Sequence, residues 1–295
     1  PRRRRAEPRA DAPPPVCMDT FVVLAVLFGA LLHAGWNALV KSSQDKDLDM
    51  ATIHLIGSFM AIPLVALVGW PKAEAWPFIA ASVVIHIGYY LALTGAYRHG
   101  DLGLTYPLMR GVAPLLVALS ATFTLGETLS PLAWAGVIGI SCGVLVLGLN
   151  RHALEAPKAV AFALANAVII AVYTVVDGLG VRASDNALQY VATLFLFDGW
   201  PFALLMFATR GPALGRYARH RWPLATIGAC ASLGSYGIAL WAMTRAPVAT
   251  VAALRETSVL FAVLLGVWFL KEALTRRRVF GAAMIASGVM ALRMG

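Results

Sequence analysis

The chain has 295 residues, of which 59% are apolar and only 13% are charged. Soluble domains have about 45–50% apolar and about 25% charged residues. A water-soluble globular fold is excluded, because it could not bury this much apolar surface. The net charge of +9 does not indicate nucleic-acid binding, because the basic residues are dispersed through short polar segments. We therefore expect an integral membrane protein that is surrounded by the lipid bilayer and binds no nucleic acid.

The first 17 residues differ from the rest of the chain. They are rich in proline and contain five of the 24 basic residues, without hydrophobic periodicity. This composition predicts a disordered leader over residues 1–17. The first methionine, Met18, directly precedes the first apolar run, so we expect the native protein to start there. The three cysteines, Cys17, Cys142 and Cys230, have no metal-binding or redox spacing, and we expect no metal and no cofactor.

Apolar runs of the length that crosses a bilayer, about 20 residues, follow one another with short polar connections. The predicted fold class is therefore an all-α integral membrane protein with about ten transmembrane helices. The predicted spans lie near residues 20–40, 50–70, 76–97, 102–125, 132–149, 159–180, 187–208, 222–244, 248–270 and 279–293.

The two halves of the sequence match each other. An offset of 145 residues aligns Tyr106–Leu147 with Val251–Leu292 without a gap. Each half contains five spans, an odd number, so the second copy must cross the membrane in the opposite orientation. We predict a first five-helix repeat over residues 18–149 and a second, inverted repeat over residues 159–295. The aligned pairs are Arg110 with Arg255, Glu127 with Glu272, Thr105 with Thr250, Gly136 with Gly281, and Gly143 with Gly288.

Several segments resemble a known family. They are LLHAGWNALVK in the first span, YPLMRGVAPLL followed by LGE, and AALRETSVLFA followed by LKE. Their order, spacing and duplication resemble the EamA-type branch of the drug/metabolite transporter superfamily over about residues 20–293. The resemblance implies a ten-helix carrier of the inner (plasma) membrane with cytoplasmic termini. Such carriers usually export amino acids or other metabolites by alternating access.

The distribution of basic residues conflicts with that orientation. Apart from Arg110 and Arg255, 13 of 22 lysines and arginines fall on the side away from the termini. The positive-inside rule therefore favours termini outside the cytoplasm, and the orientation stays open.

Ionisable side chains inside spans cost about 2.5–3.5 kcal/mol on insertion scales and usually have a function. Arg110 and Arg255 are equivalent in the two repeats, so we predict a substrate site for a carboxylate or phosphate near the pseudo-twofold axis. The alternative is that internal acids neutralise both arginines. Glu256 and Asp198 are the expected countercharges, and with Asp177 they are the candidate proton carriers. Glu256 follows Arg255 directly, so in a helix the two side chains point about 100° apart.

Other polar residues are candidates to line the transport pathway. His33, Trp36 and Asn37 share one face of the first span. The alternatives are an interfacial anchor for the tryptophan and an interhelical hydrogen bond for the amide. His54 and His86, each alone on its helix, are expected to be packing residues. Four tyrosines within spans are also candidates, with packing as the alternative: Tyr90, Tyr106, Tyr173 and Tyr236.

Prolines and glycines predict further features of the helices. Pro107 and Pro114 flank Arg110, whereas the second repeat has Ala252 and Val259 there, so we expect the two halves to bend differently at this point. Glycines in the last helix of each repeat predict that these two helices pack closely, with a homodimer contact left open. These glycines are Gly136, Gly139, Gly143, Gly281 and Gly288.

We expect a secondary transporter of a small polar metabolite, such as an amino acid or organic anion, with proton coupling as an option. The sequence has no nucleotide-binding motif, which disfavours an ATP-driven pump. It also has no paired aspartates, HExxH motif or Ser–His pair, so an intramembrane lipid-modifying enzyme is the weakest alternative. A lipid-flipping protein and an accessory membrane subunit remain open.

Overall fold

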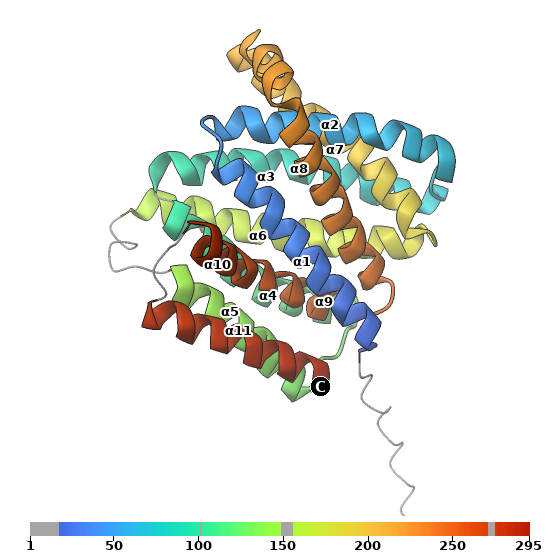
Figure 1. Ribbon diagram of the computed structural model, residues 1–295. Helices are drawn as coiled ribbons and strands as arrows, with labels where there is room; N and C mark the ends of the chain where they lie inside the picture. The colour runs from blue at the N-terminus through green and yellow to red at the C-terminus, as the bar shows by residue number, and fades with distance from the viewer. Residues whose placement is uncertain (1–17, 101, 149–155, 271–274) are drawn as a thin grey trace, which may run out of the picture.

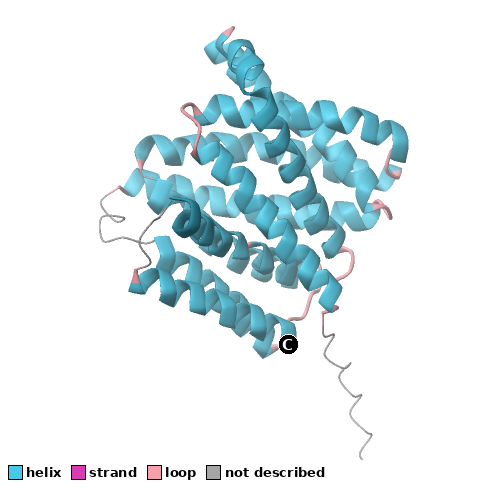
Figure 2. Cartoon of the chain, in the orientation of Figure 1, coloured by secondary structure: helices cyan, strands magenta, loops and turns pink. Residues whose placement is uncertain are grey.

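The computed structural model describes residues 18–100, 102–148, 156–270 and 275–295. In these ranges the chain forms helices joined by short loops, without a strand (Figure 2). The predicted leader, residues 1–17, and Glu272 lie outside the described residues. The elements are α1 (Thr20–Lys41), α2 (Lys46–Val68), the short 3-10 helix η1 (Ala73–Ala75), α3 (Trp76–His99), α4 (Leu102–Thr124), α5 (Pro131–Gly148), α6 (Pro157–Ala183), α7 (Ala187–Arg210), α8 (Ala213–Met243), α9 (Val248–Arg255), α10 (Thr257–Leu270) and α11 (Arg276–Met294).

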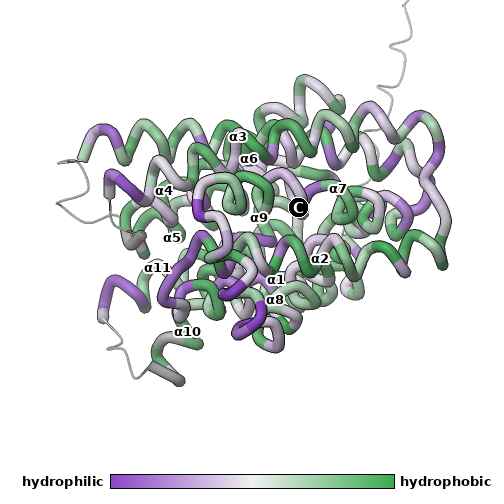
Figure 3. The backbone as a smooth tube through the Cα atoms, turned by 90° about the horizontal axis from the view of Figure 1, so that it is seen from above, coloured by the Kyte–Doolittle hydropathy of each residue, from purple (hydrophilic) through white to green (hydrophobic). Residues whose placement is uncertain are grey.

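The outer surface of the helices is apolar, as a bilayer requires. Large apolar side chains such as Leu67, Phe123 and Phe280 are strongly exposed. Water-soluble proteins rarely expose so much apolar surface. Hydrophilic stretches lie mainly at the helix ends (Figure 3). Within the described residues, nine stretches are long and apolar enough to cross a membrane, and α9 with α10 makes one of them. These features confirm the predicted all-α membrane fold.

The tenth predicted span corresponds to α11. This helix is less apolar than the others because it begins with Arg276, Arg277 and Arg278 and ends near Arg293. It nevertheless lies beside α5 along its length (Figure 1). We therefore assign it as the tenth crossing of the bundle, with its basic residues at the two membrane surfaces.

Helix pairing follows the symmetry of an inverted repeat. In the repeat, α1 corresponds to α6, α3 to α8, and α4 to α9 with α10. Helix α1 packs against α8, and the equivalent helix α6 packs against α3. Likewise α4 contacts α6, and the equivalent pair α9 and α10 contacts α1. The remaining equivalent helices pair with each other, α2 with α7 and α5 with α11, at opposite edges of the bundle (Figure 1). Exchanging the two halves thus reproduces these helix pairs.

The α5–α11 contact depends on glycine. A Cβ atom on Gly136 would lie 2.8 Å from the carbonyl oxygen of Gly288, and one on Gly143 would lie 2.8 Å from that of Gly281. Only glycine permits such a close backbone approach. Since α11 of the same chain already covers this glycine face, a homodimer would have to use another surface.

The two repeats differ at their fourth helices, and the interruption of the helix lies in the copy that has no prolines. In the first repeat α4 continues as one helix through Pro107 and Pro114. In the second repeat the helix is interrupted at Glu256, although no proline is present. The Glu256 N–H donates to the Ala253 carbonyl, and the Thr257 hydroxyl donates to the Leu254 carbonyl, closing a tight turn. The interruption therefore lies in the copy without prolines, and it brings Glu256 towards α4.

Candidate functional site

A buried ion pair joins the two repeats in the middle of the bundle. The Nε atom of Arg110 lies 2.9 Å from Oε2 of Glu256, and both side chains are almost completely buried. The break between α9 and α10 directs the glutamate to α4, which agrees with the expectation that Glu256 and Arg255 point apart. For Arg110, the structure therefore shows the alternative of an internal countercharge.

Arg255 has a different environment. Its guanidinium lies over the ring of Tyr236, with 5.0 Å between the guanidinium carbon and the ring centroid. Among the described residues, no carboxylate lies within ion-pair distance of Arg255, although its exposed fraction is only 9%. Arg110, Arg255 and Glu256 together bring two positive charges and one negative charge into the centre. An excess of one positive charge is unusual in a membrane interior, where ionised groups are usually paired.

His33 adds a polar side chain from α1. Its Nε2 atom lies 3.2 Å from Nη2 of Arg110, and its Nδ1 atom accepts from Nε1 of Trp36 at 3.3 Å. A neutral imidazole has only one acceptor nitrogen, so one tautomer cannot satisfy both donors. Asn37 donates to the His33 carbonyl at 2.8 Å, which is a bond within α1 rather than between helices. Trp36 is buried and is not an interfacial anchor.

A cavity of about 730 Å³ leads towards this centre. Its wall includes Lys41, Lys46 and Arg278, at helix ends on the face away from the chain termini. The wall also includes Asn37, Tyr90, Tyr97, Tyr106, Phe202 and Val259. Arg110, Arg255 and His33 do not line the cavity in this state. They lie next to it, since Tyr106 is one turn before Arg110 and Val259 is three residues after Glu256.

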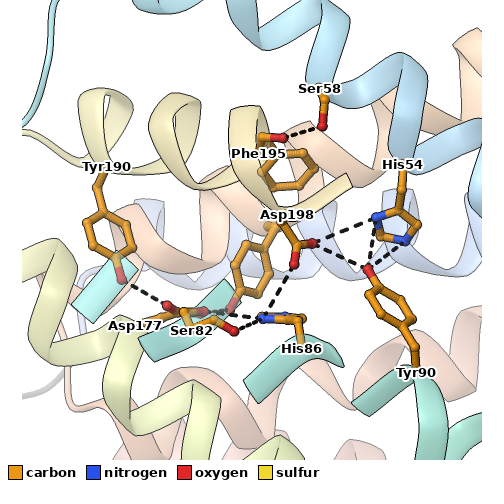
Figure 4. A network of polar contacts seen from close by, with 10 residues as sticks. His54, Ser58, Ser82, His86, Tyr90, Asp177, Tyr190, Phe195 and Asp198 are labelled. Carbon is orange, nitrogen blue, oxygen red and sulfur yellow. Dashed lines mark hydrogen bonds and ion pairs between the residues drawn. The ribbon is translucent and has the colours of Figure 1, made fainter. Parts of the chain in front are cut away.

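A second polar cluster lies between α2, α3 and α7 (Figure 4). The Asp198 carboxylate accepts from the Tyr90 hydroxyl at 3.3 Å. Its Oδ2 atom lies 3.9 Å from Nδ1 of His54, and its Oδ1 atom lies 3.7 Å from Nδ1 of His86. Tyr90 also lies 3.2 Å from Nδ1 of His54. Asp198 therefore pairs with histidines, and its expected role as a countercharge to the arginines is wrong.

The third buried acid, Asp177 of α6, is bound by tyrosines. Tyr190 donates to its Oδ1 atom at 2.8 Å, and the Tyr236 hydroxyl donates to its Oδ2 atom. Tyr236 therefore stands between Asp177 and Arg255. Tyr173 stacks on His86, with 4.5 Å between the ring centroids. Of the four candidate tyrosines, Tyr90 and Tyr106 line the cavity. Tyr236 binds Asp177, and Tyr173 packs against His86.

Comparison with known proteins agrees with this architecture. The model of the EamA-like transporter family matches residues 157–294, from the first residue of α6 to the last residue of α11. The second half of the chain is thus similar to the EamA-like transporter family. A solved crystal structure of a protein with 20% sequence identity superposes with a TM-score of 0.73, covering 92% of this chain and 97% of the other. At that identity the likeness shows the fold alone, and it extends over both repeats.

EamA-like proteins are transporters rather than enzymes, and the apolar helices make this chain a multi-pass membrane protein. The resemblance seen in the sequence is thereby confirmed. The two halves of the chain contact each other at the face where α1 begins and α11 ends. There Arg293, near the end of α11, lies 3.4 Å from Thr20 at the start of α1.

At this face, Glu127 joins the first repeat to the EamA-like half. Gly126, with φ +64°, turns the chain after α4 and places the glutamate against two helices of the second repeat. Its Oε1 atom accepts from Nη2 of Arg182 at 2.8 Å and from the Val248 N–H at 2.9 Å. Its Oε2 atom accepts from the Ala249 N–H at 3.3 Å. The carboxylate thus caps α9, where the helix dipole favours negative charge. Lys72 and Asp185 form a further ion pair between the repeats at this face.

Sequence reasoning missed the cluster around Asp198. His54 and His86 were expected to be packing residues because each is alone on its helix, yet α7 brings Asp198 to both of them. The i, i+4 spacing of His86 and Tyr90 is a signal that places them on one face of α3. Their partners come from other helices, so no local pattern indicates the cluster.

Proposed function

We propose that this EamA-like protein is a secondary transporter of the inner (plasma) membrane for a small polar metabolite with an anionic group, such as an amino acid or an organic anion. It works by alternating access between the two inverted repeats. The resemblance to EamA-type carriers favours export as the physiological direction.

One observation carries the substrate class. Arg255 lies in the core without a carboxylate partner among the described residues, whereas the equivalent Arg110 is paired with Glu256. A guanidinium binds a carboxylate or phosphate through two parallel hydrogen bonds. A substrate carboxylate at Arg255 would balance the two arginines and one glutamate of the centre. The adjacent helix break resembles the interrupted helices that form ion and substrate sites in inverted-repeat transporters.

The arrangement of contacts supports alternating access. The cavity extends from the face opposite the termini to Tyr90 and Tyr106, while Glu127 and Arg182 connect the repeats at the terminal face. The structure thus combines an open side with a side held by polar contacts. Rocking of one repeat against the other would reverse these roles.

Uptake into proteoliposomes tests the proposal. The panel contains amino acids, organic acids, phosphonates and organic cations, and the variant is Arg255→Gln. Arg245→Gln is a matched control, because Arg245 also lies over an aromatic ring, that of Trp241, but is exposed. We expect saturable flux of an anionic or zwitterionic compound that is lost in Arg255→Gln and kept in Arg245→Gln. Flux restricted to organic cations, or anion flux that survives Arg255→Gln, would overturn the substrate class.

A further inference from the structure

We propose that the cluster of His54, His86, Tyr90 and Asp198 is the site that binds and releases the coupling proton, separate from the arginine centre. The proposal rests on the proposed function, because a coupling proton requires transport. It assigns the proton to one of three buried acids by comparing their partners.

Two of the three acids are held by strong fixed partners. Glu256 forms a close ion pair with Arg110. Asp177 accepts a tyrosine hydroxyl on each oxygen, from Tyr190 and from Tyr236. Hydrogen bonds and an opposite charge both favour the charged form of a carboxylate. Both acids are therefore suited to remain charged throughout the transport cycle.

Asp198 has an incomplete set of partners. Its Oδ2 atom accepts one hydrogen bond, from Tyr90, and its buried Oδ1 atom has no hydrogen-bond partner among the described residues. The histidine nitrogens at 3.7 and 3.9 Å are beyond hydrogen-bond distance. A buried charged oxygen without a partner is costly, and protonation of the carboxylate lowers that cost because the group becomes neutral. Oε2 of Glu256 also lacks a hydrogen bond, but it lies 2.9 Å from Nε of Arg110, whereas among the described residues only histidines lie within ion-pair distance of Asp198.

The hydrogen-bond directions define a path for the proton. The single hydrogen of the Tyr90 hydroxyl goes to Asp198, so the hydrogen between Tyr90 and His54 belongs to Nδ1 of His54. A doubly protonated His54 can pass its Nδ1 proton to the Tyr90 oxygen while Tyr90 passes its own proton to Oδ2 of Asp198. The products are neutral His54, protonated at Nε2, and neutral Asp198. Tyr90 also lines the cavity, so the path begins next to the open side.

The remaining neighbours of Asp198 do not compete for this role. On α3, His86 lies 2.8 Å from the Ser82 carbonyl, which can only accept, so Nδ1 of His86 carries a hydrogen and faces Asp198. The other titratable groups next to the cluster are Tyr89 on α3 and Tyr173 and Asp177 on α6. Tyr236 from α8 contacts Tyr173 and Asp177. Towards α1, the Trp36 ring lies between His54 and His33, with ring centroids 6.3 and 5.3 Å away. His33 contacts Arg110, so the cluster and the arginine centre are close enough to interact electrostatically.

Infrared difference spectroscopy of the full-length reconstituted protein tests the site with the proton itself as the ligand. Acidification of the wild-type protein should produce the carbonyl band of a protonated carboxylic acid, shifted in D2O. We expect Asp198→Asn to lose this band, and Glu256→Gln, Asp177→Asn and the control His99→Gln to keep it. His54→Gln should keep the band but shift its midpoint pH. A band that persists in Asp198→Asn, or that disappears in Glu256→Gln or Asp177→Asn, would overturn the proposal.

Transport measurements separate this proposal from the proposed function. With a panel compound that shows exchange in the wild type, Asp198→Asn should retain exchange between the two sides but lose accumulation driven by a pH gradient. Retention of gradient-driven accumulation would overturn the coupling role. If the wild type moves no compound while Asp198 still gives the infrared band, the proposed function fails and the proton-binding site stands.

Discussion

The Oε2 atom of Glu256 lies 2.9 Å from Nε of Arg110, so the helix break of the second repeat is tied to the unbroken fourth helix of the first. Its sequence neighbour Arg255 has no such partner among the described residues and lies over Tyr236. Two arginines that are equivalent in the repeat therefore have different environments. A symmetric bundle acquires in this way one structural arginine and one that is suited to meet a substrate.

Arg110→Met should destabilise the protein more than Arg255→Met. Removing one partner of a buried ion pair typically costs about 3–5 kcal/mol, because the other charge remains buried and unpaired. Loss of a cation–π contact costs about 0.5–2 kcal/mol. Thermal unfolding in one detergent measures both changes. In the double variant Arg110→Met with Glu256→Met most of the stability should return, and equal losses in the two single variants would contradict the assignment.

Gly136→Ala should weaken the contact between α5 and α11, whereas Gly139→Ala should not. The new Cβ at position 136 would lie 2.8 Å from the Gly288 carbonyl oxygen, but at position 139 its nearest neighbour would be 3.4 Å away. We expect a loss of about 1–3 kcal/mol for Gly136→Ala, as for other overpacked sites. Gly139→Ala should be neutral or gain up to about 1 kcal/mol from helix propensity. Thermal unfolding compares the two, and similar losses would argue against the tight backbone approach.

Glu127→Ala should open the terminal face of the bundle. The change removes the ion pair with Arg182 and leaves the N-terminal end of α9 uncapped. Each 1.4 kcal/mol that is lost from the closed state changes the ratio of the two states about tenfold. In a background without native cysteines, Thr250→Cys, which is buried behind this contact, should become reactive to a water-soluble maleimide.

Glu127→Ala should also lower the reactivity of a cysteine on the opposite side of the pathway towards the maleimide. Thr94 lines the cavity, so Thr94→Cys should react readily in the parent background and more slowly with Glu127→Ala. Glu74→Ala, an exposed acid on the terminal face, serves as the control and should change neither rate. If both cysteines became more reactive, Glu127→Ala would loosen the bundle instead of shifting it between two states.

The contact between Lys72 and Asp185 should stabilise the terminal face in a pH-dependent way. The hydrogen bond from Lys72 to Asp185 raises the pKa of the lysine above its ordinary value of 10.5. This contribution is therefore fully present below that value and is lost as the pH rises through the raised pKa. Both side chains are more than half exposed, so the effect should be small and reduced by salt. Lys72→Gln should show lower stability than the wild type at neutral pH, and the difference should vanish in strongly alkaline solution.

The sequence by itself determined the all-α membrane fold, and it predicted about ten spans and an inverted repeat. Composition and run length decide that the bilayer is the solvent, because apolar segments of this length have no other stable environment. The offset that aligns Arg110 with Arg255 also identified both arginines, since charge inside a span is visible without coordinates. The shared face of His33, Trp36 and Asn37 follows from helix periodicity alone.

Only the tertiary structure decided how these charges are paired. Prolines in α4 predicted that the two halves bend differently, yet the helix break is at Glu256, where no proline is present and the side chain forms an ion pair with Arg110. His54, His86 and Asp198 are far apart in the sequence and meet only because α2, α3 and α7 are neighbours. Glu127 likewise reaches Arg182 across the two repeats. Helix periodicity predicts which face a side chain occupies, but the partner on the next helix depends on how the helices pack.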